Sequence, residues 1–377
     1  MYLINIAARK SSAGVPASER SSTKSLALVF DPRLNALNAL RLALAVGVIF
    51  FHSFPLTGTP LRWWPAAQFL GNAFVDGFFA LSGFLILSSW VRNPQWWAFL
   101  RARLLRILPA FYVCLAFTAF VAAPLAVVIR GEGMPPGFPE SIESFVKNNA
   151  LLEMRQFDIA GTPADVPFAQ AWNGSLWTLY WEFKCYLAVL VLGVLGCLKW
   201  RLTVPMIFLL TLAGSITARI AHIDSILVNN TLRFALMFSA GAVVYVFRHR
   251  IPANWGLVAV AAVVIGWSTT AGDYRFYAAL PLAYLLIVAG SLIKVPRLRL
   301  KNDLSYGMYI YAFPMQQLLA TVGLASWGAV GFGIVSTLAT VPLAAASWFL
   351  IERRALRYKT TRTAPTPNDP AAEPAPS

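Results

Sequence analysis

The sequence predicts an all-α integral membrane protein, a bundle of about ten transmembrane helices with both termini in the cytoplasm. Of the 377 residues, 58% are hydrophobic and only 12% are charged, whereas soluble domains carry about a quarter charged residues. The mean hydropathy is +0.62. Apolar runs of about 17 to 25 residues recur along the chain, which is the length that a helix needs to cross a bilayer.

The apolar runs follow one another without an internal repeat or a separable soluble domain. They lie at residues 34–54, 74–90, 107–129, 175–198, 202–221, 230–247, 255–271, 276–293, 304–322 and 330–351. Lipid offers no hydrogen-bond partners to the backbone, so a segment that crosses it must be a helix or a strand of a closed barrel. These runs are too long for barrel strands, and each is therefore expected to be a helix. One membrane domain is therefore expected over residues 34–358, between disordered cytoplasmic tails at 1–33 and 359–377.

The basic residues set the predicted orientation. The net charge is +15, and most of the 31 Lys and Arg residues fall in the tails and in alternate loops. The other loops hold only Arg62, Arg130, Lys147, Arg155, Arg219 and Arg275. Because loops rich in Lys and Arg stay in the cytoplasm, both termini are expected inside.

Neither a nucleic-acid partner nor a metal site is expected. The basic surplus follows the membrane topology, so it does not indicate nucleic acid. Cys114, Cys185 and Cys197 lie on predicted spans without metal-ligand spacing. They are therefore interpreted as structural thiols, without a zinc site or a disulfide framework.

The first span carries two ionisable side chains, Arg41 and His52. Their spacing of eleven residues is about three helical turns, so both project from one face, about 16 Å apart along the axis. Ionisable groups at membrane depth usually face a protein interior or an aqueous cavity that serves chemistry or transport. His52, near the outer end, can exchange a proton near neutral pH. An ordinary interfacial polar residue is the alternative.

Further polar residues follow on the second and third spans. Asp76 and Ser82 lie on the second, where a helix N-cap and a small packing residue are the structural alternatives to a role in a site. Arg103 and Arg106 begin the third span and share a helix face. With Arg41 they form a basic inner level suited to a phosphorylated cytosolic donor, because guanidinium groups bind phosphate bidentately. Anchoring of the helix end at the membrane surface is the alternative.

A long external loop at residues 130–174 precedes the fourth span. A loop of about 45 residues is uncommon unless it is functional or disordered. It is expected to cap an external mouth and to contact an acceptor.

The fourth span begins with Ser175 and Glu182, which are seven residues apart and share a helix face. Ser175 and Glu182 are expected at one outer level with His52 and Asp76, where a carboxylate would orient the imidazole. Two polar levels that face opposite compartments favour a reaction across the membrane. The structural alternatives are a pair of Glu182 with Lys184 or Arg233, and an N-cap role for Ser175.

Six segments combine in order and at suitable spacing. They are LNALR leading to FH at 37–52, DGFFALSGFL at 76–85, RLLRILPAFY at 103–112, SLWTLYWE at 175–182, LSYGMYIY at 304–311 and SWFLIE at 347–352. Together they resemble the acyltransferase-3 family of integral-membrane sugar O-acyltransferases, including its Arg-x10-His signature. Each segment alone is a weak signal, but six in register over residues 35–358 are a strong one.

The resemblance implies transfer of an acyl group, usually acetyl, from cytosolic acetyl-CoA or another acyl-CoA, with no bound cofactor. The acceptor would be a hydroxyl of a cell-envelope or secreted glycan or of a lipid-linked saccharide, at the inner membrane of a bacterial cell. It makes His52 the catalytic base or acyl relay, with Arg41 and Glu182 as further catalytic residues. The substrate-binding residues that it implies are Arg103, Arg106, Ser175, Asp76, Ser82, Trp177 and Tyr309.

One position departs from the family pattern. Family members often have a His in the ninth span between a Tyr and a Pro, where this chain has Ala312. Any role of that His must be absent or relocated. Some relatives append an esterase-like domain that completes the external transfer, and this chain is expected to act directly or to pass the group to a separate envelope-glycan partner protein.

Two other classes of function fit the residues. One is a transporter or flippase for a lipid-linked sugar or a small anion, with Arg41 and His52 on its path; the other is a non-catalytic subunit of an envelope-polysaccharide complex. The absence of an internal repeat gives no support to an inverted-repeat transporter. The sequence does not identify the acceptor hydroxyl. It also does not decide whether the transferred group is acetyl or a longer acyl group.

Overall fold

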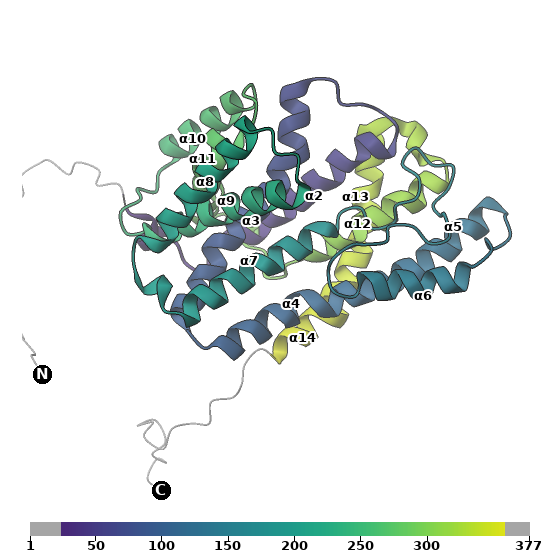
Figure 1. Ribbon diagram of the computed structural model, residues 1–377, viewed down its shortest axis with the longest axis horizontal. Coiled ribbons are helices and arrows are strands. Elements are labelled where there is room, and N and C mark those ends of the chain that lie inside the picture. Colours follow the sequence, from purple (N-terminus) through teal and green to yellow (C-terminus); the bar gives the residue numbers. More distant parts are fainter. Residues whose placement is uncertain (1–23, 359–377) are drawn as a thin grey trace, which may run out of the picture.

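The computed structural model describes residues 24–358, and these residues are helical without a β-strand. The helices are α1 (Leu26–Val29), α2 (Leu37–Leu56), α3 (Trp64–Arg92), α4 (Trp96–Phe117), η1 (Thr118–Ala122), α5 (Ala123–Arg130), α6 (Phe138–Asn149), α7 (Trp177–Val194), η2 (Cys197–Lys199), α8 (Thr203–Ile220), α9 (Ile226–Val246), α10 (Trp255–Ser268), α11 (Arg275–Leu292), η3 (Pro296–Leu298), α12 (Ser305–Thr321), η4 (Leu324–Trp327), α13 (Gly328–Ala346), η5 (Ser347–Glu352) and α14 (Arg353–Arg357). In Figure 1, α4, η1 and α5 form one long rod, and α6 lies alongside α5.

Eight helical stretches of the described chain are long and apolar enough to cross a membrane. They are Leu37–Leu56, Trp64–Arg92, Trp96–Arg130, Trp177–Val194, Thr203–Ile220, Ile226–Val246, Arg275–Leu292 and Leu324–Arg357. The predicted class, an all-α multi-pass membrane protein, is thereby confirmed. The other two predicted spans are shorter helices, α10 with 14 residues and α12 with 17 residues.

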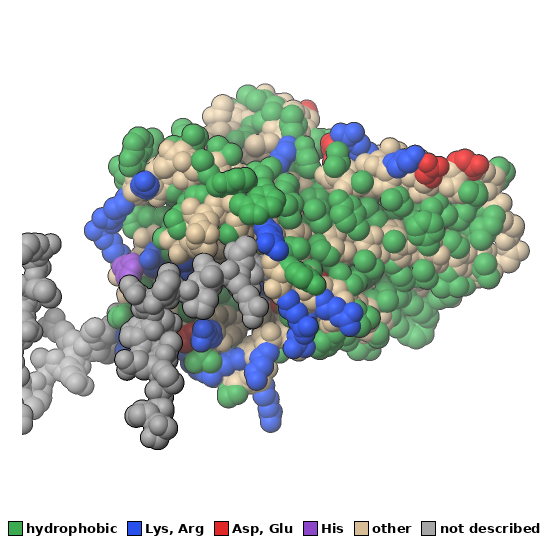
Figure 2. Space-filling view, turned by 90° about the horizontal axis from the view of Figure 1, so that it is seen from below, with side chains coloured by type: hydrophobic (Ala, Val, Ile, Leu, Met, Phe, Trp, Pro, Cys, Tyr) green, Lys and Arg blue, Asp and Glu red, His purple; other side chains and the backbone are tan. Residues whose placement is uncertain are grey.

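The surface agrees with this class. In Figure 2 hydrophobic side chains cover most of the face in view, Lys and Arg side chains gather toward its lower left, and Asp and Glu side chains lie mainly at the upper right. Apolar side chains on the outside of a helix bundle are what contact with lipid tails requires.

Two helix starts differ from the prediction. α3 begins at Trp64, with Pro65 in its first turn, instead of at residue 74. Asp76 therefore lies well inside the helix and is not an N-cap. α7 begins at Trp177 with Leu176 at the N-cap position, so Ser175 is not an N-cap either. Pro is favoured in the first turn because the first amides of a helix have no intrahelical partner.

The described part of the predicted N-terminal tail is ordered. Leu26, in α1, is fully buried, and its amide donates to the carbonyl of Ile251 at 2.8 Å. The expectation of a disordered segment up to residue 33 is therefore wrong for residues 24–33. Residues 1–23 and the predicted C-terminal tail at 359–377 lie outside the described residues.

Alternate loops meet at two ends of the bundle. The segments 24–36, 93–95, 195–202, 247–254, 293–304 and 353–358 form what we call the basic end; the segments 57–63, 131–176, 221–225, 269–274 and 322–323 form the loop end. At the basic end, the amide of Ala36 donates to Gly290 and the side chain of Asn38 to the carbonyl of Leu300. At the loop end, Gln68 donates to the carbonyl of Ala271 at 3.0 Å.

α3 and α9 cross at two glycines. A Cβ atom added to Gly83 would lie 1.9 Å from the carbonyl oxygen of Phe238, and one added to Gly241 would lie 1.8 Å from that of Ala80. Helices in membranes associate through such small residues, because close backbone contact increases their van der Waals attraction. This crossing positions α3, which carries Asp76 and Ser82, against the rest of the bundle.

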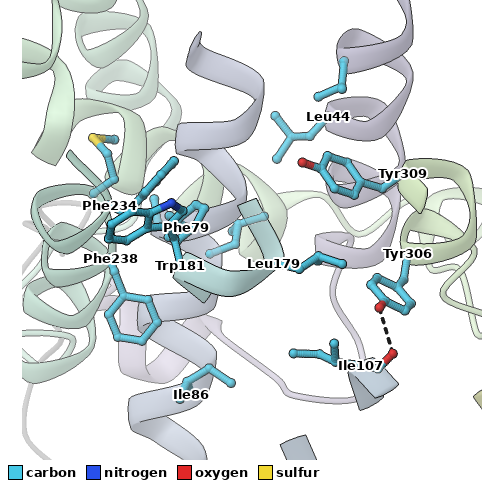
Figure 3. Close-up of a cluster of buried hydrophobic side chains, with 14 of the residues drawn as sticks. Leu44, Phe79, Ile86, Ile107, Leu179, Trp181, Phe234, Phe238, Tyr306 and Tyr309 are labelled. Atoms are coloured by element: carbon cyan, nitrogen blue, oxygen red, sulfur yellow. Dashed lines mark hydrogen bonds between the residues drawn. The ribbon is translucent and has the colours of Figure 1, made fainter. Parts of the chain in front are cut away.

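α12 is the central helix. Residues 305–314 are all buried, and Tyr306 donates from its hydroxyl to the carbonyl of Ile107 at 2.9 Å. Figure 3 shows Tyr306 and Tyr309 beside an aromatic cluster in which Phe79 stacks on Phe234, with ring centroids 4.2 Å apart. The two tyrosines thus bring polar groups into the apolar interior of the bundle.

The long loop covers the loop end of α12. Its segment after α6 lies on this helix, where Gln317 donates to the carbonyls of Phe168 at 2.7 Å and Ala171 at 2.6 Å. The ring of Phe168 meets that of Phe313 edge-on, with centroids 6.0 Å apart. Tyr112 of α4 also bonds to the loop, at the carbonyl of Ala150.

Candidate active site

The basic end holds a cluster of buried ion pairs. Arg41 of α2 donates to Oδ2 of Asp303 at 2.5 Å, and Arg106 of α4 donates to the same oxygen at 2.6 Å. Arg106 also donates to Oε2 of Glu352 at 2.9 Å. None of these side chains is more than 21% exposed. The cluster therefore ties α2, α4 and η5 to the segment that precedes α12.

Asp303 is held in its charged form. Burial alone would raise the pKa of its carboxyl, but Arg41, Arg106 and the hydrogen bonds from Ser305 lower that pKa to about 2. The Ser305 hydroxyl donates to Oδ1, the oxygen that the arginines do not use. The carboxylate is thus an acceptor on both oxygens and stays ionised at neutral pH.

A pocket of about 280 Å³ opens beside this cluster, and we call it the basic pocket. Arg41, Arg103, Arg106 and Lys301 line it, against one carboxylate, Asp303. Even with Glu352 behind Arg106 and Glu182 beside Tyr186, the four cationic side chains outnumber the carboxylates, so the pocket keeps an excess of positive charge. Such a pocket attracts anionic ligands, and its guanidinium groups suit phosphate or carboxylate groups in particular.

Arg103 has a hydrogen-bond donor that no described residue accepts from. Its Nη2 donates to Oγ of Ser89 at 3.2 Å, but its Nε is buried and has no hydrogen-bond partner among the described residues. The guanidinium lies over the rings of Phe99 and Tyr186, at 5.5 and 5.9 Å from the ring centroids. A buried donor without an acceptor costs free energy. An anion bound in the basic pocket would supply the missing acceptor.

Glu182 lies between the basic pocket and a smaller cavity. Its Oε1 accepts from Oγ of Ser82 at 3.2 Å and from the hydroxyl of Tyr186. The smaller cavity, of about 40 Å³, shares Arg41, Arg106 and Tyr186 with the basic pocket. The structure thus brings Ser82 and Glu182 to the predicted inner arginines.

The smaller cavity ends at hydroxyl groups that join α7 to α12. The hydroxyls of Thr178 and Tyr309 are 2.5 Å apart, and Tyr309 also donates to the carbonyl of Ser175 at 2.8 Å. Ser175 in turn donates to the carbonyl of Tyr309 at 3.3 Å. Phe78 forms part of the opposite wall and meets the Tyr309 ring edge-on, with centroids 5.9 Å apart. Predicted residues from distant segments, Ser175 and Tyr309, therefore meet here.

His52 lies farther along α2 toward the loop end. Its ring meets that of Phe313 edge-on, with centroids 5.2 Å apart. Between Arg41 and His52, the side chains of Ala45 and Ile49 are fully buried and pack in a cluster with Met308 and Ala312 of α12. Arg41 and His52 thus face α12 from the same side of their helix, as their spacing predicts.

The predicted partners of His52 lie elsewhere. No hydrogen bond or ion pair in the described part of the chain joins the His52 ring to Glu182 or to Asp76. The predicted place of Glu182 at the outer level is wrong, because Glu182 lines the smaller cavity with Arg41 and Arg106, whereas Asp76 lies toward the loop end as predicted. α7 runs toward the basic end, so Glu182 lies closer to the arginine level than its place in the sequence suggested.

Asp76 belongs to a second charge cluster. It is fully buried, and it accepts from Nε of Arg233 at 2.8 Å and from the hydroxyl of Tyr274 at 2.5 Å. Arg275 lies 3.9 Å away. Arg233 thus pairs with Asp76 rather than with Glu182, and Lys184 lies over the rings of Tyr180 and Trp181.

Trp177 packs in the apolar interior. Its ring lies 5.6 Å from that of Phe234, in the aromatic cluster of α3, α7 and α9. It lines neither the basic pocket nor the smaller cavity.

The residues of this site that sequence reasoning missed include Thr178, Tyr186, Lys301, Asp303 and Glu352. Charge balance could have found the two acids, because three arginines at membrane depth require counter-charges and few acidic residues occur in the segments of the basic end. Tyr186 lies four residues after Glu182, on the same helix face.

The chain matches a family model described as an acyltransferase domain over residues 34–349. It is 28% identical over 341 residues to an O-acetyl transferase of Shigella phage Sf6, with 88% of this chain and 97% of that protein covered. It is 27% identical over 367 residues to Nodulation protein 10 of Rhizobium leguminosarum bv. viciae, with 88% of this chain and 95% of that protein covered. No solved structure shows a significant match.

Proposed function

Since the chain belongs to the acyltransferase family whose model it matches, and is thus a membrane acyltransferase for groups other than aminoacyl groups, we propose its donor, acceptor and catalytic base. The donor is cytosolic acetyl-CoA, which enters at the basic end. The acceptor is a hydroxyl of a cell-envelope or secreted glycan at the loop end. The protein lies in the inner membrane of a bacterial cell, with both termini in the cytoplasm.

The basic pocket supports an acyl-CoA donor. Coenzyme A carries a pyrophosphate and a ribose phosphate, and the pocket offers Arg41, Arg103, Arg106 and Lys301. Arginine binds such groups with two parallel hydrogen bonds. The open Nε of Arg103 is the single observation that carries this assignment, because it is a buried cationic donor that awaits an acceptor.

The smaller cavity supports an acetyl group. It continues from Arg41 and Arg106 toward Tyr309, so a thioester could reach it while the nucleotide stays in the basic pocket. Its small volume of about 40 Å³ suits a small acyl group such as acetyl. Glu182, with Ser82 and Tyr186, forms the polar wall between the two spaces.

His52 is the proposed base. It removes the proton from the acceptor hydroxyl, whose oxygen attacks the thioester carbonyl; the carbon–sulfur bond then breaks, and the coenzyme A thiolate takes up a proton. The place of His52 at the loop end of the face that it shares with Arg41 supports this role. A positioned base contributes about 10² to 10⁴ in rate.

The experiment uses the full chain in lipid nanodiscs with labelled acetyl-CoA and purified, deacetylated envelope polysaccharide. We expect transfer of label to the polysaccharide and a loss of about 10² or more in His52→Ala. His249→Ala, an exposed histidine at the basic end, is the matched control and should keep full activity. Normal transfer by His52→Ala would refute the role of His52, and flux of a substrate without release of coenzyme A would favour a transporter.

A further inference from the structure

The loop end has a second cavity that the reaction proposed above does not use. It measures about 290 Å³ and lies among α3, α8, α9 and α11. Its walls include Arg219, Asn230, Arg233, Asp273 and Arg275. We call it the polar cavity. Much of its lining comes from helix ends and from the loops at this end of the bundle, and it carries charged groups of both signs.

Two of the guanidinium groups in its wall are held rigidly. Arg233 is fixed by the fully buried Asp76 at 2.8 Å. Arg275 makes two hydrogen bonds of 2.8 Å to Asp273, one to each carboxylate oxygen. Side chains that are already ordered lose little entropy when a ligand binds, so these walls are preorganised.

Some other polar side chains of the cavity have no hydrogen-bond partner among the described residues. Arg219 and Asn230 make no side-chain hydrogen bond or ion pair within the described residues, and His222 at the rim makes none either. They offer both donors and acceptors to a ligand.

The charges of the polar cavity nearly cancel. Its three guanidinium groups, from Arg219, Arg233 and Arg275, face Asp224 and Asp273 in the lining, with Asp76 directly behind Arg233. The basic pocket, counted in the same way with Glu352 behind Arg106 and Glu182 beside Tyr186, keeps a small excess of positive charge. A balanced mixture of donors and acceptors suits an uncharged ligand with many hydroxyl groups better than it suits a phosphate.

We propose that the polar cavity is a saccharide subsite, which holds a sugar residue of the acceptor glycan apart from the residue that is acylated. This inference rests on the proposed function, because it takes the acceptor to be a glycan. It assigns a binding role to α8, α9 and α11, which contribute nothing to the lining of the basic pocket or of the smaller cavity.

The subsite lies one helix away from His52. Asn72 of α3 lines the polar cavity, and a Cβ atom added to its neighbour Gly71 would lie 3.0 Å from the Phe51 ring. The Phe51 ring is 5.6 Å from that of His52. α3 therefore lies between the polar cavity and His52. An acceptor must be several sugar residues long to bind in the polar cavity while another of its hydroxyls reaches His52, so longer acceptors should bind more tightly than short ones.

The test measures kcat and KM for size-fractionated fragments of deacetylated envelope polysaccharide at saturating acetyl-CoA. In the wild-type protein, we expect KM to fall by about tenfold or more between the shortest fragments and longer ones, which corresponds to one or two hydrogen bonds. In the double variant Arg219→Ala/Asn230→Ala, this gain should disappear, while activity with the shortest fragments stays unchanged. Thr231→Ala, beside Asn230 but outside the cavity, is the control.

The outcomes separate the two proposals. Length dependence that survives in the double variant, or none in an active wild-type protein, would overturn the subsite and leave the proposed function intact. A wild-type protein that acetylates no fragment of any length would overturn the proposed function, and the subsite with it. Both substituted residues are surface-accessible, so the double variant should fold, and a thermal unfolding curve of the variant checks this.

Discussion

Arg41 and Asp303 form an ion pair of 2.5 Å across 262 positions of sequence. The pair joins the first long helix to the segment that leads into the central helix α12. Since Arg106 donates to the same carboxylate oxygen at 2.6 Å and also pairs with Glu352, two arginines of the basic pocket share the single negative charge of Asp303. Removing a partner from a buried pair leaves an uncompensated charge, so this carboxylate should matter for both stability and charge.

Asp303→Asn should destabilise the protein by about 2 kcal/mol, the free energy that corresponds to the fall of the Asp303 pKa from 3.8 to about 2. Arg41 loses its counter-charge in this variant, while Arg106 keeps its pair with Glu352. Thermal unfolding in a fixed detergent measures the effect. Glu143→Gln is the matched control, since its pair with Lys147 is more than 60% exposed on both sides, and an exposed pair is worth about 1 kcal/mol or less. Equal effects of the two changes would contradict the structural importance of Asp303.

The stability that Asp303 contributes should depend on pH only in acid. Its pKa falls from the usual 3.8 to about 2 in the folded protein, so the unfolded chain takes up the proton first as the pH drops. The contribution of about 2 kcal/mol is therefore complete above about pH 4 and is lost as the pH falls toward 2. Unfolding curves of wild type and Asp303→Asn between pH 2 and 7 should converge at the acid end; a constant gap would disprove the assignment.

Much of the fold and part of the site follow from local patterns in the sequence. Apolar runs locate the long helices because each run is long enough to cross a bilayer, and helical spacing places Arg41 and His52 on one face. Ser175 and Tyr309, which the family resemblance implied, do meet, through the hydrogen bonds of α7 to α12.

The remaining features depend on tertiary packing that spacing does not encode. Glu182 accepts from Ser82, 100 positions away, and Arg106 pairs with Glu352 across 246 positions. The position of a residue within an apolar run also predicts its depth in the membrane poorly where a helix tilts or extends beyond the run. α3, for example, begins ten residues before its apolar run. For these reasons the predicted place of Glu182 beside His52 and Asp76 was wrong, since Glu182 lies with the arginines of the basic end.

Arg103→Ala should raise KM for acetyl-CoA by about 10- to 100-fold, because a hydrogen bond to a charged group is worth about 1.5 to 3 kcal/mol. Steady-state kinetics with varied acetyl-CoA measure this change, and the difference between the two proteins should shrink at high salt, which screens the charges. Arg92→Ala serves as the control, since Arg92 is exposed and does not line the pocket. A KM that Arg103→Ala leaves unaltered would place the donor phosphates elsewhere.

Phe78→Ala should let the enzyme use larger acyl groups. Phe78 lines the smaller cavity opposite Tyr309, and each methylene in a tight pocket changes specificity by about 10- to 200-fold. The ratio of kcat/KM for butyryl-CoA to that for acetyl-CoA should rise at least about tenfold. Phe120→Ala, at a side chain 63% exposed on the outside of the bundle, should leave the ratio unchanged, and an unaltered ratio in Phe78→Ala would mean that the acyl group binds in another space.

Gly83→Ala should disrupt the bundle, because the new methyl group would lie 1.9 Å from the carbonyl oxygen of Phe238 and neither backbone can move without parting α3 from α9. Overpacking of this kind costs about 1 to 3 kcal/mol or more, and the reciprocal change Gly241→Ala, 1.8 Å from the carbonyl of Ala80, should cost as much. The yield of monodisperse protein and its unfolding temperature measure the loss. Gly266→Ala on α10 is the matched control, since no other atom lies within 4 Å of the added carbon, and alanine favours a helix over glycine by about 1 kcal/mol. If Gly83→Ala proved as stable as Gly266→Ala, the close contact of α3 with α9 would be refuted, and with it the position of Ser82 and Asp76 relative to α9.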